Sequence, residues 1–112
     1  YVPARIFALL VAAHSPRRAR ELLDTIGRDA PAHPSPNAGV AETAMAAALG
    51  VELGGPLRYG QRVENRPRLG DGRRPEPADV DSGVAASNRA ELVATAALTV
   101  AALIAAVLSG RR

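Results

Sequence analysis

Six side chains near the middle of the chain have the chemical types needed for acid–base work and for holding a charged substrate. They are His33, Asn37, Glu42, Arg58, Tyr59 and Arg66. Glu42 and His33 are the predicted catalytic residues, Glu42 as a base toward an amine or as a metal ligand, and His33 as a general base or a substrate contact. The predicted substrate-binding residues are Asn37, Arg58, Tyr59 and Arg66. Arg58 and Arg66 are the candidate anion clamp, because a guanidinium fork matches phosphate bidentately.

Five of these six residues also have an explanation that involves no chemistry. A lone histidine between prolines is commonly a surface residue, Asn37 can cap a helix, and arginines are mostly solvated. Glu42 would be favoured by the helix dipole if it lay in a first turn. If it were buried in an apolar helix, it would need an arginine, a metal ion or a substrate amine beside it, because an unpaired buried charge is costly. The sequence leaves both kinds of explanation open.

Proline and glycine mark the limits of the element that carries Glu42. Prolines at positions 31, 34 and 36 fix φ, so residues 30–36 are predicted to be extended. Ser35 is a predicted N-cap with Pro36 at the first helical position, and the helix is predicted from about Ala38 to Leu49. Gly50 is expected in the left-handed conformation that ends a helix, which lets Val51 fold back on Ala46. The glycines at 54 and 55 predict a sharp turn before Arg58.

Apolar stretches at the two ends of the chain suggest contact with a membrane. The run Ile6–Ala13 is too short to span a bilayer and is either the tail of a span or an interfacial helix. Residues 21–26 are predicted to form a short amphipathic helix that Gly27 ends. Residues 62–78 are rich in Arg, Pro and Gly and are predicted to be a loop. A last helix is predicted from Asp79 to about Ser109, with an apolar run at 92–108 at the lower limit for a transmembrane helix.

The composition excludes several kinds of chemistry within this sequence. All fourteen basic residues are Arg, so there is no lysine for a Walker phosphate-binding loop or a Schiff base. There is no Cys, which excludes thiol catalysis and cysteine zinc sites here. The net charge is +3, but acidic residues are interleaved with the arginines and aromatic residues are scarce. No nucleic-acid partner is therefore predicted.

The middle of the chain resembles the C-terminal signature of a known enzyme family. The runs that carry the resemblance are H-P-S-P-N-A-G at 33–39, Glu42, A-M-A at 44–46, A-L-G-V at 48–51, L-G-G-P at 53–56 and Y-G at 59–60. They are similar to the adenosylcobinamide-phosphate synthase (CobD/CbiB) family, and the likeness continues through Y-V-P-A-R at 1–5 and R-P-R-L-G-D-G at 66–72. Ala47, Leu57 and Gln61 depart from the usual glycine, asparagine and glycine of that family.

The resemblance implies the fold and the location of the chain. The first residue is Tyr rather than Met, which suggests a fragment of a longer chain. Because members of the family are longer and membrane-bound, we expect the C-terminal part of a protein of the cell membrane. The implied fold is all-α, a multi-pass helical membrane protein with a Pro/Gly/Arg-rich loop region between helices. Residues 1–14 would end a membrane or interfacial helix, 28–60 would form the signature region, 61–78 a loop, and 79–109 the C-terminal transmembrane helix.

The resemblance also implies an activity, cofactors and partners. The activity is an ATP-dependent C–N ligation of aminopropanol or its phosphate to adenosylcobyric acid, a step of cobalamin biosynthesis that gives adenosylcobinamide or its phosphate. ATP and Mg²⁺ are implied, with unknown metal ligands, and the segment alone is expected to be inactive. The implied partners are the corrinoid and amine substrates, membrane lipid, and other enzymes of cobalamin assembly.

Two other classes of function stay open from the sequence. One is a noncatalytic membrane scaffold or sensor with the same fold, and the other is a small helical interaction module with an apolar anchor. The polar residues His33, Asn37, Glu42 and Tyr59 beside a glycine turn favour the enzyme, because a scaffold has no need to keep them together.

Overall fold

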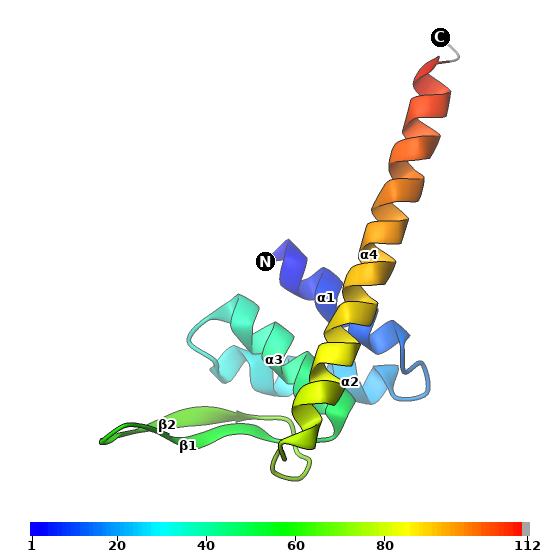
Figure 1. The fold of residues 1–112 in the computed structure, drawn as a ribbon. Helices are drawn as coiled ribbons and strands as arrows, with labels where there is room; N and C mark the ends of the chain where they lie inside the picture. The colour runs from blue at the N-terminus through cyan, green and yellow to red at the C-terminus, as the bar shows by residue number, and fades with distance from the viewer. Residues whose placement is uncertain (111–112) are drawn as a thin grey trace.

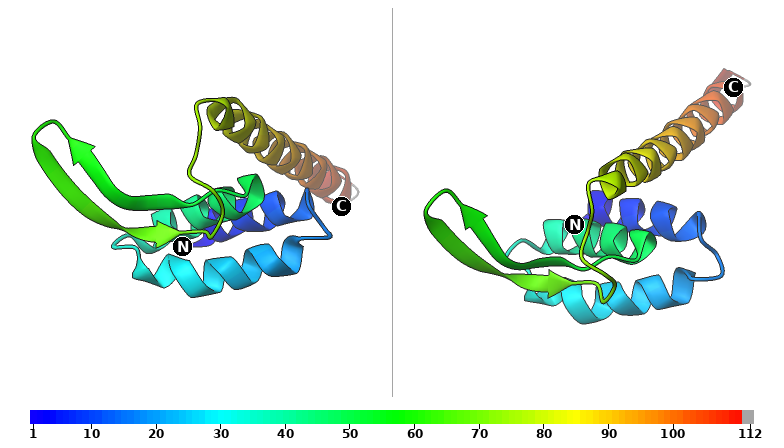
Figure 2. Two further views of the ribbon diagram at one scale, coloured as in Figure 1. Left: turned by 90° about the horizontal axis from the view of Figure 1, so that it is seen from below. Right: turned by 60° about the horizontal axis from the view of Figure 1, so that its bottom comes forward.

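The computed structural model describes residues 1–110 and consists of a small helical body, a β-hairpin and a long projecting helix (Figure 1). The elements in chain order are α1 (Val2–Ala13), α2 (Ala19–Asp29), the 3₁₀ helix η1 (Ala30–Ala32), α3 (Pro36–Leu49), β1 (Leu53–Tyr59), β2 (Arg62–Leu69) and α4 (Ala78–Gly110). The hairpin extends from the body beside α3, and α4 runs away from it in another direction (Figures 1 and 2).

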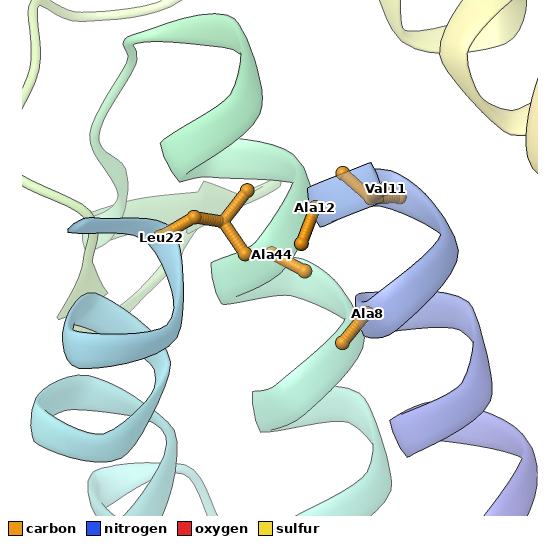
Figure 3. Close-up of a cluster of buried hydrophobic side chains, with 5 residues drawn as sticks. All are labelled: Ala8, Val11, Ala12, Leu22 and Ala44. Atoms are coloured by element: carbon orange, nitrogen blue, oxygen red, sulfur yellow. The ribbon is translucent and has the colours of Figure 1, made fainter. Parts of the chain in front are cut away.

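Small side chains form most of the core of the helical body. Ala44 of α3 is fully buried and lies between Leu22 of α2 and the α1 residues Ala8, Val11 and Ala12 (Figure 3). Because an alanine side chain occupies little volume, the backbones can approach one another, and α1 and α2 both pack closely against α3. Helix α3 is therefore the central element, and it holds Glu42 in a fixed position.

The two ends of α3 confirm the sequence prediction. The Ser35 hydroxyl accepts a hydrogen bond from the Ala38 N–H at 3.4 Å, and Pro36 is the first helical residue. Gly50 has a φ of 67°, and its N–H donates to the Ala47 carbonyl at 3.3 Å. The Val51 N–H donates to the Ala46 carbonyl at 3.0 Å, which completes a Schellman motif.

Two predictions before α3 are wrong. The segment 30–36 is not extended throughout, because Ala30–Ala32 form a 3₁₀ helix that directly follows α2. Pro31 fits there since the first turn of a helix needs no N–H from it. Gly27 does not end α2, which continues to Asp29. A tight contact fixes this arrangement: a Cβ on Gly39 would lie 2.5 Å from the Ala30 carbonyl oxygen, so only glycine lets η1 pack this closely on α3.

The all-α prediction is also wrong, because residues 53–69 form an antiparallel hairpin. Leu53 pairs with Leu69 and Tyr59 with Arg62, so Gly60 and Gln61 make a two-residue turn. Only Gly55 and Leu69 of the two strands are buried, and the sequence therefore lacks the alternation of apolar and polar residues that reveals a half-buried strand. The predicted loop at 61–78 contains β2 and becomes irregular only after Leu69.

The base of the hairpin is fastened to α2 by an aspartate. The Gly70 N–H donates to Oδ2 of Asp29 at 2.8 Å, and Arg28 donates to both oxygens of the same carboxylate at 2.6 and 2.8 Å. The Arg28 hydrogen bonds are the main reason why the pKa of Asp29 is lowered. The helical body and the hairpin are thus joined through a charge-assisted cluster.

A bulge near the base of the hairpin depends on Gly54. The register shifts between Leu53 and Gly55, and Gly54 has a φ of 83°. A Cβ at this position would lie 2.0 Å from the Pro67 carbonyl oxygen. Gly54→Ala should therefore lower the free energy of unfolding by about 1–3 kcal/mol. The measurement is thermal unfolding of the detergent-solubilised protein.

Gly27→Ala is the matched control for this substitution. Gly27 lies inside α2 with open space around its Cβ position, so alanine should raise stability by about 0.5–1 kcal/mol. If both variants unfolded at the temperature of the parent, the bulge would not be a strained, glycine-dependent feature.

Helix α4 begins at a fixed point and ends far from the body. Both Nη atoms of Arg73 donate to the carboxylate of Asp79, at 2.8 and 2.7 Å, and the Glu76 N–H donates to it at 2.7 Å. These bonds, the guanidinium first, lower the pKa of Asp79 to about 2. Folding therefore favours the carboxylate form of Asp79. The stability that these bonds contribute is fully present above the usual titration range of Asp and is lost as the pH falls toward 2.

Beyond Ala90, which is buried, the apolar residues of α4 are exposed except for the half-buried Ala94. Within residues 1–110, α4 is the single helix long and apolar enough to cross a membrane, and α1 is only 12 residues long. The predicted last helix is confirmed, whereas the predicted multi-pass arrangement is wrong for these residues because only one such helix is found.

Candidate functional site

A cleft of about 340 Å³ lies between α3 and the hairpin, and it brings together four of the six predicted site residues. His33 and Glu42 line it on the helical side, and Tyr59 and Arg66 line it on the hairpin side. The two pairs are separated in the sequence, and the fold brings them together. In both views of Figure 2 the hairpin starts beside the helical body and its turn projects beyond it.

His33 and Glu42 are neighbours in this cleft. Nε2 of His33 is 3.8 Å from Oε1 of Glu42, with the His33 side chain 11% exposed and the Glu42 side chain 49% exposed. Nδ1 of His33 is 3.0 Å from the backbone N and from the carbonyl oxygen of Ser35. When Nδ1 accepts the Ser35 N–H, the proton of the neutral imidazole is on Nε2 and faces Glu42. At 3.8 Å the two atoms are beyond hydrogen-bond distance, so the imidazole is a close neighbour of the carboxylate and not its hydrogen-bond donor.

The position of Glu42 removes one explanation that the sequence left open. Helix α3 begins at Pro36 and has no acidic residue in its first turn. Glu42 is in the second turn, where the field of the helix N-terminus has largely decayed. The helix dipole therefore does not account for a carboxylate at this place.

The alternation of side chains along the hairpin separates Tyr59 from Arg58. Tyr59 and Leu57 line the cleft, while Arg58 between them is directed to the other face, opposite Val63. Nε of Arg58 donates to the Gly60 carbonyl at 2.9 Å, an interaction within the turn. Arg66 lines the cleft, and its Nη2 is 3.1 Å from Oε2 of Glu64.

Asn37 and Arg58 are the two predicted binding residues that the fold does not bring to this cleft. Asn37 is exposed in the first turn of α3, and the cap of that helix is Ser35. Of the two residues expected to form the anion clamp, the fold thus brings only Arg66 to Glu42 and His33.

The sequence model of the family described as CobD/Cbib protein matches residues 1–87. This chain belongs to the CobD/Cbib family. The match confirms the predicted family and covers the helical body, the hairpin and the first turns of α4.

Curated relatives agree with this assignment. The chain is 49% identical over 90 residues to the cobalamin biosynthesis protein CobD of Mycobacterium tuberculosis, covering 78% of this chain and 29% of that protein. It is 50% identical over 90 residues to CobD of Rhodobacter capsulatus, covering 80% and 28%. CobD of Halalkalibacterium halodurans is 39% identical over 97 residues, covering 82% and 30%. The chain thus spans less than a third of the length of these relatives. No solved structure matches it.

Two further charged residues line the cleft of this CobD/Cbib family member. Glu52, between α3 and β1, and Arg74, after β2, were not among the predicted site residues. Glu52 follows the helix-ending glycine and precedes the Gly-Gly pair, which is the one signal that could have found it. Nothing in the sequence separates Arg74 from the neighbouring arginines, because its place depends on contacts with distant residues.

The described residues offer no complete metal site of their own. Among residues 1–110, no three His, Cys, Asp or Glu side chains gather closely enough to hold a metal ion. Glu42 and Glu52 both line the cleft, and Mg²⁺ is commonly held by one or two carboxylates together with substrate phosphates. Glu42 fits as a single ligand in a shared site of that kind, whereas the Glu52 carboxylate already contacts the guanidinium groups of Arg68 and Arg74.

Proposed function

We propose that this chain takes part in cobalamin biosynthesis as part of a membrane-bound, ATP-dependent C–N ligase. The reaction joins the amino group of aminopropanol or its phosphate to a carboxyl group of adenosylcobyric acid and gives adenosylcobinamide or its phosphate. Membership in the CobD/Cbib family and the relatives named cobalamin biosynthesis protein support the pathway. The observation that supports the chemistry is the Glu42–His33 pair in one cleft with Arg66.

The proposed role of Glu42 follows from the state of the amine. An alkylamine is protonated near pH 7 and must lose a proton before its nitrogen can attack a carboxyl carbon. Glu42 takes that proton, and His33, whose Nε2 lies 3.8 Å from Oε1 of Glu42, is its neighbour in the cleft. The half-exposed side chain is compatible with this role because an incoming amine must reach it from the solvent side of the cleft.

Arg66 has a proposed role at the leaving group. If ATP activates the carboxyl group as an acyl phosphate, the new C–N bond forms as the C–O bond to phosphate breaks, and phosphate leaves with the electron pair. A guanidinium stabilises the negative charge that develops on the phosphoryl oxygens. Tyr59, in the same cleft, is a proposed hydrogen-bonding contact to substrate. ATP and Mg²⁺ supply the activation of the carboxyl group, and membrane lipid surrounds the apolar part of α4.

Cells that lack the protein provide the test of the pathway. We expect adenosylcobyric acid to accumulate in them and externally supplied cobinamide to restore cobalamin, because the block precedes attachment of the amine. Corrinoids are measured by liquid chromatography and mass spectrometry. Normal levels of adenosylcobyric acid together with failure of cobinamide to restore growth would favour a noncatalytic scaffold.

A further inference from the structure

The Glu52 carboxylate contacts two guanidinium groups at one wall of the cleft. Its Oε1 is 2.5 Å from Nη1 of Arg68 and 3.6 Å from Nη1 of Arg74, and the Glu52 side chain is only 19% exposed. One carboxylate facing two guanidinium groups leaves one positive charge in excess. Arg74 lines the cleft, whereas Arg68 does not. The excess positive charge is therefore on Arg74, where a ligand in the cleft can reach it.

The backbone around Glu52 fixes where Arg74 lies. The Glu52 N–H donates to the Arg73 carbonyl at 2.8 Å, and Val51 and Arg73 form a parallel β-bridge. Nη1 of Arg74 also donates to the Gly54 carbonyl at 3.0 Å. The segment with Arg74 is therefore held against the start of β1 by backbone and side-chain bonds.

Arg74 keeps hydrogen-bond donors for a ligand. Within residues 1–110, Nη1 is the one atom of its guanidinium with a partner, which leaves Nε and Nη2 available. Arg73 is the contrasting case, since both of its Nη atoms are used by Asp79. The Arg74 side chain is 56% exposed and the cleft gives access to it.

We infer that Arg74 binds a carboxylate or phosphate group of the ligand that enters this cleft, and that Glu52 is the positioning residue that holds Arg74 in place. The free edge of a guanidinium matches the two oxygens of either anion. The inference deepens the proposed function and rests on it only for the identity of the substrate that carries the anionic group. Binding of a simple anion at Arg74 can be measured without any assay of the reaction.

Protection from chemical modification tests the binding group. The purified protein in detergent is treated with phenylglyoxal, which modifies accessible arginines, in the presence of inorganic phosphate, acetate or chloride. We expect phosphate or acetate to slow modification of Arg74 by about tenfold relative to chloride, the factor expected for a charge-assisted hydrogen bond. Peptide mapping by mass spectrometry gives the rate at each arginine.

Arg62 is the internal control, because its side chain is 79% exposed and it does not line the cleft. Its rate should be the same in all three salts. The salt that protects Arg74 more strongly, phosphate or acetate, shows whether the group bound by Arg74 is a phosphate or a carboxylate. Equal rates for Arg74 in all three salts would overturn the inference.

Substitutions separate positioning from binding. Glu52→Gln keeps the shape of the side chain but weakens its hold on Arg74, so protection of Arg74 should fall toward that of Arg62. In the ligase assay the KM for the anionic substrate should rise about tenfold with kcat within about twofold. Arg74→Lys keeps the charge without the fork and should show the same rise in KM. A variant that lowers kcat and leaves KM and protection unchanged would contradict the assignment.

The two proposals fail in different ways. If the protein makes no cobinamide but phosphate or acetate protects Arg74, the anion site stands and the proposed reaction is wrong. If it makes cobinamide and Arg74 shows no protection, the reaction stands and the anion must be bound elsewhere.

Discussion

Replacing Glu42 by glutamine in the full-length protein should lower the proposed ligase activity by about 10²-fold or more, the low end of the range for a lost acid–base group. The amide keeps the shape of the side chain beside His33, whose Nε2 is 3.8 Å away in the parent, but it cannot take a proton from an amine. The protein should still accumulate in membranes, because the Glu42 side chain is half exposed and its removal leaves no buried charge unpaired. Formation of cobinamide or its phosphate by membranes from cells producing the variant is the measurement.

Glu21→Gln is the matched control for this substitution. Glu21 is an exposed carboxylate on α2 whose partner is Arg18, and it lies outside the cleft. Its loss should leave activity unchanged. If Glu42→Gln kept activity within about twofold of the parent, Glu42 would be a structural residue, and the base would have to be sought elsewhere in the protein.

Features set by neighbouring residues were predictable from the sequence. The start of α3 depends on Ser35 and Pro36, and its end depends on Gly50, so short-range capping rules describe both. The length of α4 follows from its apolar composition and from an acidic residue near its start. Local rules also place Glu42 on α3.

Features set by distant residues were not predictable in the same way. The hairpin has few buried side chains, and its position depends on Asp29 holding Gly70 from another element. The Glu52–Arg74 contact joins residues on either side of that hairpin, so an all-α interpretation could not bring them together. Arg58 and Arg66 looked equivalent in sequence, and the register of the strands separates them.

Introducing a single charge into the exposed apolar part of α4 should show whether this helix spans a membrane or packs on protein. In the parent, we expect the protein to stay in the membrane pellet after extraction at alkaline pH, because the apolar side chains of residues 92–108, apart from the half-buried Ala94, are exposed in the described structure. Leu98, 72% exposed, lies near the middle of this run. Leu98→Arg should release a large share of the protein into the soluble fraction, since an arginine at the centre of a span costs about 2.5–3.5 kcal/mol on insertion scales.

Ser87→Arg provides the comparison, because Ser87 is an exposed position of the same helix before the apolar run begins. It adds the same charge outside the expected bilayer and should leave the protein in the pellet. Equal release of the two variants would mean that the position of the charge along α4 does not matter, which a spanning helix does not allow. A parent protein that is soluble without detergent would show instead that the apolar face of α4 is covered by protein, and the proposed membrane location would be wrong.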